Sequence, residues 1–210
     1  MSYAVKEVFF SIQGEGANSG CPAVFCRFAG CNLWSGREED RVSAVCSFCD
    51  TDFRGTNGDG GGRFESAEML AAHICAFWPS KEVPPFVIFT GGEPSLQLDS
   101  ALIALLHDRC GRIGIETNGT RPLPSGLDWV CVSPKVGTEL SVLKGQELKL
   151  VYPQVGIDPS DYLDLEFDHF SLQPLDGPDL EQSIAACLRY CLSHPRWRLS
   201  LQTHKFLGVR

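Results

Sequence analysis

The chain has 210 residues, of which 43% are hydrophobic, and it carries 18 basic and 26 acidic side chains for a formal net charge of −8. This composition predicts a single globular domain over residues 1–210, and the negative charge argues against binding to a nucleic-acid backbone, which needs a basic patch. No apolar run approaches the roughly 18 residues of a membrane span. The first residues show no basic segment followed by an apolar one, so we expect a cytoplasmic protein with no membrane contact.

Short β-like runs alternate with helical patterns along the chain. Strands are predicted at Glu7–Ser11, Ala23–Phe28, Phe86–Phe89, Ile113–Glu116, Trp129–Val132, Glu147–Val151, His169–Leu172 and Arg198–Leu201. Helices are predicted at Ser66–Phe77, with Ser66 as N-cap, and at Leu98–Arg109 and Leu180–Leu192. This order predicts an α/β fold with a largely parallel sheet. Because strands outnumber helices, we expect an incomplete, TIM-like (β/α) barrel. The Gly-rich run 57–62 is most simply a flexible surface loop.

Three of the ten cysteines lie close together in the sequence, in a C-x14-C-x2-C pattern. They are Cys31, Cys46 and Cys49. In a reducing compartment, clustered cysteines are more often metal ligands, whereas scattered ones are more often small buried hydrophobes. An iron–sulfur cluster held by three thiolates would leave one iron open, since four is the usual number. Zinc needs a fourth ligand, which Cys21 or Cys26 could supply, although the alternating pattern around Cys26 favours the core. The three cysteines alone leave zinc and iron–sulfur equally open.

A second motif, Thr90–Gly91–Gly92–Glu93–Pro94, directly follows the predicted strand Phe86–Phe89. Two glycines at the carboxyl end of a strand allow a ligand to approach the backbone closely. Glu93 could accept hydrogen bonds from an ammonium group. In isolation the motif could simply be a tight turn. Downstream of a cysteine triad in the same chain, it favours the iron–sulfur interpretation.

The cysteine triad and this motif together resemble the radical S-adenosylmethionine (SAM) superfamily, whose common spacing is C-x3-C-x2-C. Here the first interval is longer, which leaves Cys26 as a weak rival to Cys31 for the first ligand. Further motifs resemble those of the 7-carboxy-7-deazaguanine synthase family. They are Phe10–Gly16, Arg27–Trp34, Cys49–Thr51, Glu116–Gly119, Ser133–Lys135 and Gln202–Lys205. This resemblance covers the chain from residue 7 to the C-terminus.

The resemblance implies a lyase that converts 6-carboxy-5,6,7,8-tetrahydropterin to 7-carboxy-7-deazaguanine with loss of ammonia, in the biosynthesis of 7-deazapurines such as the queuosine precursor. It implies three cofactors, namely a [4Fe–4S] cluster, SAM and Mg2+. In the family, the reduced cluster cleaves SAM to a radical that abstracts hydrogen from substrate C6, and SAM is then regenerated. The resemblance also implies a homodimer and a reductant protein of the flavodoxin or ferredoxin type.

The same resemblance implies three sets of site residues. The metal-binding set is Cys31, Cys46 and Cys49 for the cluster and Thr51 for Mg2+. The SAM-binding set is Phe48, Asp50, Gly92, Glu93, Glu116, Asn118, Ser133, Lys135 and Gln173. The substrate-binding set is Ile12, Gln13, Gly14, Glu15, Gly16, Arg27, Thr90, His204 and Arg210. Chemically, Glu15 can accept hydrogen bonds from the N–H groups of a pterin and Arg27 offers a fork for its carboxylate. No catalytic acid or base is assigned, because the radical comes from SAM.

Two alternatives stay open at this point. An enzyme that activates a glycyl-radical protein would share the cysteines and the GGE segment, but it does not require Gln13, Glu15, Arg27 and Thr51 together. A zinc-stabilised binding module without catalysis would be colourless and hold one zinc per chain. The polar interval 32–45 between the first two cysteines has no assigned role, and neither has the Gly-rich run.

Overall fold

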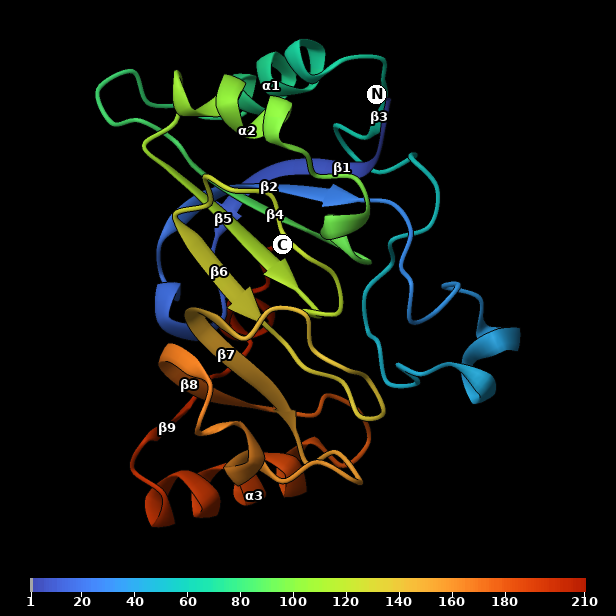
Figure 1. Ribbon diagram of the computed structural model, residues 1–210, viewed down its shortest axis with the longest axis vertical. Helices are drawn as coiled ribbons and strands as arrows, with labels where there is room; N and C mark the ends of the chain where they lie inside the picture. Colours follow the sequence, from blue (N-terminus) through green and yellow to red (C-terminus); the bar gives the residue numbers. More distant parts are fainter. Residues whose placement is uncertain (1) are drawn as a thin grey trace.

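The computed structural model describes residues 2–210 and contains one nine-stranded sheet with the order β3-β1-β2-β4-β5-β6-β7-β8-β9 (Figure 1). The strands are β1 Tyr3–Ile12, β2 Pro22–Phe28, β3 Gly62–Phe64, β4 Phe86–Gly91, β5 Arg112–Thr117, β6 Trp129–Val132, β7 Lys144–Tyr152, β8 Glu166–Pro174 and β9 Trp197–Leu199. The α-helices are α1 Ala67–Ala76, α2 Ser100–His107, α3 Leu180–Ser193 and α4 Thr203–Leu207. Every predicted strand and helix is therefore present.

The sheet is parallel from β2 through β4 to β9, and β1 joins it antiparallel between β2 and β3. Helices α1 and α2 cover one end of its outer face and α3 covers the other, whereas β5, β6 and β7 follow one another through loops (Figure 1). The predicted partial barrel with few helices is confirmed. Among residues 2–210, no helix combines the length and apolarity needed to cross a membrane.

Side chains alternate between the two faces of each strand, as the pleat requires. On β2, Val24, Cys26 and Phe28 point outward into a core that also holds the buried faces of α1 and α2. A second outer core lies between β7, β8 and α3. Inward-facing apolar residues form a smaller cluster inside the barrel, comprising Phe9, Ala23, Phe25, Phe86 and Ile88. Cys26 is fully buried in the first core, so the prediction that it is a core residue is confirmed.

The N-caps of α1 and α2 are side chains of the type that the sequence marks as helix starts. The Ser66 side chain accepts a hydrogen bond from the Met69 backbone N–H, which confirms the predicted N-cap of α1. Asp99 caps α2 in the same way through the Leu102 N–H. Helix α2 therefore begins two residues later than predicted, at Ser100.

The Gly-rich run differs from the expected flexible surface loop because it is fastened to β1. The Val8 N–H donates to the Asp59 carbonyl (2.9 Å), and the Gly58 N–H donates to the Lys6 carbonyl (2.9 Å). A Cβ on Gly61 would lie 2.2 Å from that same Lys6 oxygen. Glycine thus permits the close approach of two backbones here, and the run leads directly into β3.

Candidate active site

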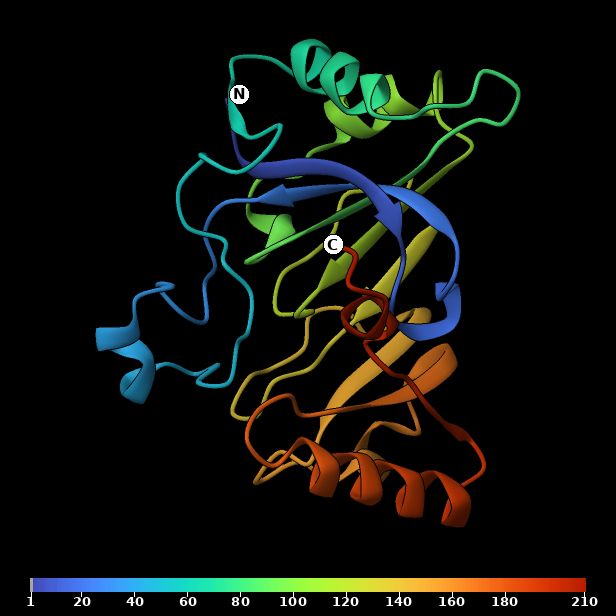
Figure 2. The same ribbon diagram turned by 180° about the vertical axis from the view of Figure 1, so that it is seen from behind.

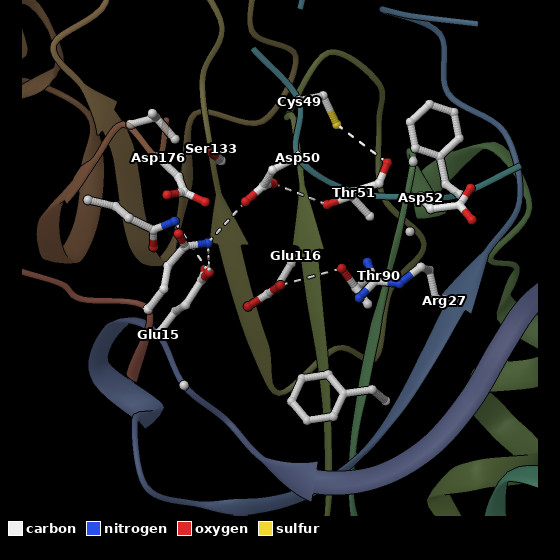
Figure 3. Close-up of a pocket in the computed structure, with 18 of the residues that line it drawn as sticks. Glu15, Arg27, Cys49, Asp50, Thr51, Asp52, Thr90, Glu116, Ser133 and Asp176 are labelled. Carbon is white, nitrogen blue, oxygen red and sulfur yellow. Dashed lines mark hydrogen bonds between the residues drawn. The ribbon is translucent and has the colours of Figure 1, made fainter. Parts of the chain in front are cut away.

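A cavity of about 670 Å3 opens at the carboxyl ends of the parallel strands (Figure 3). In barrels of this type, ligands bind at that end. The predicted residues that line it are Ile12, Gln13, Gly14, Glu15, Arg27, Thr90, His204, Arg210, Phe48, Asp50, Gly92, Glu116, Asn118, Ser133, Lys135, Gln173, Cys31, Cys46, Cys49 and Thr51. Gly16 and Glu93 do not line it. The fold thus gathers nearly all of the predicted residues around one space.

The polar walls of the cavity come from inward-facing residues in the carboxyl-terminal halves of successive strands. Arg27 on β2 pairs with Thr90 on β4, and Glu116 on β5, Lys149 on β7 and Gln173 on β8 line the same cavity. Figure 3 shows Arg27, Thr90 and Glu116 directed toward the same space. The apolar inner cluster lies nearer the other ends of the strands. The barrel interior is therefore apolar at one end and lined by polar and charged side chains at the other.

Three free thiols, those of Cys31, Cys46 and Cys49, lie along one wall of the cavity. The Leu33 backbone N–H donates to the Cys31 sulfur (3.4 Å). A hydrogen bond from the Cys46 thiol lowers the pKa of Cys49 to about 6, whereas that same bond with burial raises the pKa of Cys46 and burial raises the pKa of Cys31. Cysteine sulfurs are the usual ligands of iron–sulfur clusters, so the three side chains are of the right type to hold one. Within the described residues, no three His, Cys, Asp or Glu side chains are arranged to hold a single metal ion.

Within the predicted GGE segment, Gly91 and Gly92 line the cavity, whereas Glu93 lies behind its wall. A Cβ on Gly92 would lie 2.2 Å from the Gly30 carbonyl oxygen and 2.8 Å from the Cys31 Cβ, so glycine lets this backbone reach the cysteine loop. Glu93 is fully buried. Its carboxylate accepts hydrogen bonds from the Thr117 hydroxyl (2.7 Å) and the Asn118 N–H (2.8 Å). Glu93 thus ties the end of β4 to the end of β5 behind the cavity wall.

Gly16, the other predicted residue outside the lining, sits against a buried carboxylate. It has a left-handed φ of 64°, and a Cβ there would lie 2.5 Å from both carboxylate oxygens of Glu147. Glu147 accepts hydrogen bonds from the Ala17 N–H and from the Ser171 hydroxyl (2.7 Å). Gly16 therefore supports the turn that carries Gln13 and Glu15, without facing the cavity itself.

A buried cation joins the predicted substrate-binding and SAM-binding sets. The Lys149 ammonium donates a short hydrogen bond to Glu15 and lies 3.6 Å from Glu116. The Gln13 amide donates to Glu116 (2.9 Å). Burial alone would raise the pKa of Glu15, but the charge and hydrogen bond of Lys149, with a hydrogen bond from Gln202, lower it. Glu15 is thus held as an anion inside the barrel.

Gln173 presents an unpaired acceptor to this site. Its amide nitrogen donates to Glu15 (3.3 Å), but its amide oxygen is buried without a hydrogen-bond partner among the described residues. A buried acceptor left unpaired costs free energy, and most native ones have a partner. The arrangement fits a ligand that brings an N–H or O–H donor to this point.

The C-terminal segment folds back over the opening of the barrel (Figure 2). The backbone N–H and hydroxyl of Thr203 both donate to the Gly14 carbonyl (2.9 and 2.8 Å). Lys205 bridges Asp50 (2.8 Å) and Asp176 (2.5 Å). Arg210 pairs with Asp59 (2.6 Å) and with Glu7. These contacts place His204 and Arg210 at the cavity, although Thr203 lies 189 residues after Gly14 and Arg210 lies 151 residues after Asp59.

No family model matches the chain. The curated 7-carboxy-7-deazaguanine synthase of Bradyrhizobium diazoefficiens is 59% identical over 210 residues, covering 100% of both chains. The one from Burkholderia multivorans is 56% identical over 209 residues, again covering 100% of both. The chain belongs to the 7-carboxy-7-deazaguanine synthase family. A crystal structure of QueE from Escherichia coli has the same fold, with a TM-score of 0.67, 28% identity, and coverage of 96% of this chain and 94% of that one.

Several polar residues of this family member's cavity were not predicted. They are Lys149, Gln202, Lys205, Asp176, Lys6, Glu7 and Asp52. For Lys149 a signal exists, since Glu147 and Lys149 alternate with Leu148 and Leu150 in one strand. That alternation indicates a strand with one polar face, and in a barrel that face points inward. Lys6 and Glu7 lie on β1 where its register with β2 shifts, so simple alternation does not place both of them. The others come from loops and the C-terminal segment, where no periodicity marks them.

Proposed function

We propose that this protein is a radical SAM lyase that converts 6-carboxy-5,6,7,8-tetrahydropterin to 7-carboxy-7-deazaguanine and ammonia. The family membership supports this activity. The observation that carries the proposal is one cavity lined by three free thiols, by Gly92 and by Lys149 with its two partners Glu15 and Glu116. Its volume lies within the range of small-molecule sites, roughly 300–1,000 Å3.

The cofactor side of the cavity is formed by the cysteine loop and the ends of β5, β6 and β8. Cys31, Cys46 and Cys49 would hold a [4Fe–4S] cluster, which when bound supplies the electron that cleaves SAM. The chain's own contribution is to bind and orient. The Lys135 ammonium is fixed by the Ser133 carbonyl and hydroxyl (2.7 Å each), and the Gln173 oxygen offers an unused acceptor. Glu93 supports this wall from behind in the structure, and its contact with the SAM ammonium group stays a prediction.

The substrate side is formed by the turn after β1, the end of β2 and the C-terminal segment. Arg27 uses its Nε to bind Glu7 (2.8 Å), and that pair does not engage its two terminal nitrogens, which suit a carboxylate. Glu15 already accepts from Lys149, Gln202 (2.9 Å) and Gln173 (3.3 Å). A carboxylate has about four acceptor positions. A pterin N–H would therefore take the remaining position or displace the longest bond, that of Gln173.

The magnesium ion is part of the proposal through Thr51. Its hydroxyl lies 3.5 Å from the Asp50 carboxylate, at the edge of the cavity nearest Cys49 (Figure 3). Mg2+ prefers oxygen ligands and keeps several waters, so a hydroxyl and the substrate carboxylate form a chemically suitable pair. The ion would act as a template and neutralise charge.

We also propose a cytoplasmic homodimer that receives electrons from a flavodoxin or ferredoxin type protein. The homodimer and the electron donor are supported by the resemblance to the family. The location is supported by the N-terminal sequence, which has no basic segment followed by an apolar one.

The test is an anaerobic assay of the iron–sulfur-reconstituted protein with reductant, SAM, Mg2+ and 6-carboxy-tetrahydropterin. We expect 7-carboxy-7-deazaguanine by chromatography, without 5′-deoxyadenosine in equal amount because SAM is regenerated. Omitting Mg2+ should lower the rate. SAM cleavage without product would contradict the substrate assignment. A protein that binds zinc, stays colourless and does not cleave SAM would contradict the radical chemistry.

A further inference from the structure

The long interval between the first two cysteines projects from the barrel wall and contains a short 3-10 helix, Glu38–Ser43 (Figure 1). The segment 44–51, which carries Cys46 and Cys49, has neither helix nor strand. Regular hydrogen bonding therefore does not fix the backbone between these two ligands. Side-chain contacts must fix this backbone instead, and Arg41 makes two of them.

The Arg41 guanidinium contacts three parts of the loop at once. Its Nε and Nη2 donate to the two carboxylate oxygens of Glu38 (2.7 and 2.6 Å). Its Nη1 donates to the backbone carbonyls of Ser47 (2.8 Å) and Cys49 (3.0 Å). These carbonyls lie on either side of Phe48. Arg41 thus holds the backbone of the segment between Cys46 and Cys49 through hydrogen bonds to two of its carbonyls.

The same guanidinium lies over the Trp34 ring, 4.1 Å from its centroid. Trp34 is itself held firmly, since its indole N–H donates to the Arg37 carbonyl (3.1 Å) and its ring meets Phe53 edge-on (5.6 Å between centroids). The backbone N–H groups of Leu33 and Trp34 point at the Cys31 sulfur. Trp34 therefore connects Arg41 to the first cysteine.

We propose that Arg41 is a positioning residue that fixes the three cysteine ligands relative to one another, and that the long interval exists in part to supply it. The inference rests on the proposed function, because it takes Cys31, Cys46 and Cys49 as cluster ligands. A planar, five-donor guanidinium is needed to stack on an indole, chelate a carboxylate and reach two carbonyls together. Hydrogen-bonded partners behind metal ligands commonly change metal retention by roughly 10–100-fold when they are removed.

The experiment compares Arg41→Met and Arg41→Lys with Arg37→Met as the matched control. Arg37 lies on the same projecting segment, but its side chain makes one long contact, with Glu39 (3.4 Å). Each protein is reconstituted anaerobically, and release of iron to a chelator is followed by absorbance. The electron paramagnetic resonance spectrum of the reduced cluster and the melting temperature of the iron-free protein are recorded beside it.

We expect R41M to release iron roughly tenfold faster than the unmodified protein, with an altered spectrum, while R37M behaves as the unmodified protein. R41K should also release iron faster, because an ammonium cannot span the three contacts. The iron-free proteins should melt alike. Equal release rates in R41M and the unmodified protein, or equal acceleration by R37M, would overturn the role of Arg41 alone. An unmodified protein that takes up no iron would overturn the cluster assignment itself.

Discussion

At the scale of single residues, Lys149 organises the charge of the cavity. It is 6% exposed, lies on an inward-facing position of β7, and has Glu15 and Glu116 as neighbours. Burying ions is costly unless each is paired and hydrogen-bonded. Here the one cation is shared by a residue assigned to the substrate and one assigned to SAM. The two binding regions are thereby linked through a single side chain.

Replacing Lys149 by methionine should lower the stability of the folded protein. Removing Lys149 leaves Glu15 and Glu116 as partly buried anions with no cation between them, and for a buried pair such a loss is worth about 3–5 kcal/mol at most. We expect K149M to lower the free energy of unfolding by that order in urea titrations, and to weaken substrate binding. Lys144→Met is the matched control, since Lys144 lies exposed at the start of the same strand. Equal stability of K149M and K144M would contradict this role.

The pH dependence of stability should report the ionised state of Glu15. Its pKa lies below the ordinary 4.5. A depressed pKa stabilises the fold fully above the unfolded value, and the contribution disappears as pH falls through the folded value. We expect the difference in unfolding free energy between the native protein and Glu15→Gln to be constant from pH 7 down to about 4.5 and to shrink below it. A difference that grows on acidification would mean that Glu15 is protonated in the folded protein.

At the scale of elements, the short helix α4 docks on the turn that follows β1. The contact is tight because Gly14 has no side chain, and an ideal Cβ there would lie 2.1 Å from the Nδ1 atom of His204 and 2.8 Å from its Cβ. A side chain at position 14 would therefore force the Cβ atom of His204 to move as well as its imidazole ring. The position of His204 at the cavity thus depends on a glycine far away in the sequence.

Gly14→Ala should therefore displace α4 and leave the barrel intact. We expect faster amide hydrogen exchange at residues 203–207 and weaker substrate binding, with a stability loss of about 1–3 kcal/mol, as is typical of overpacking. Gly62→Ala is the control, because a Cβ on Gly62 would meet Phe64 at an ordinary 3.6 Å. Unchanged exchange at α4 in G14A would refute the docking argument.

The sequence predicts the long elements well because their signals are local. Strands and helices of the barrel show alternation or caps, as at Ser66, and the motif residues sit at strand ends. Strand β3 and helix α4 have three and five residues, too short for a periodicity to show. The hydrogen bond between Glu93 and Thr117 could not be predicted, because it depends on how β4 and β5 pair and not on the GGE segment itself.

At the scale of the whole molecule, the chemistry and the stability of the fold reside in separate parts. The two outer cores are built from strand and helix residues, and neither contains Cys31, Cys46 or Cys49. Cys187 belongs to the core beneath α3. The barrel is thus a scaffold whose packing does not require a metal, in contrast to a zinc module whose folding is coupled to its ion.

This separation predicts opposite effects for two cysteine substitutions. Cys31→Ala should abolish retention of the iron–sulfur cluster and SAM cleavage, while the iron-free protein melts within a few degrees of the unmodified iron-free protein. Cys187→Ala should retain four irons per chain and lower the free energy of unfolding by about 1 kcal/mol, the central value for single substitutions. Iron content and thermal unfolding, measured on both variants, test whether the cluster loop and the apolar core are independent. If C31A failed to fold while C187A lost no stability, the metal loop would be part of the structural core, and the barrel could not be the independent scaffold that its two apolar clusters indicate.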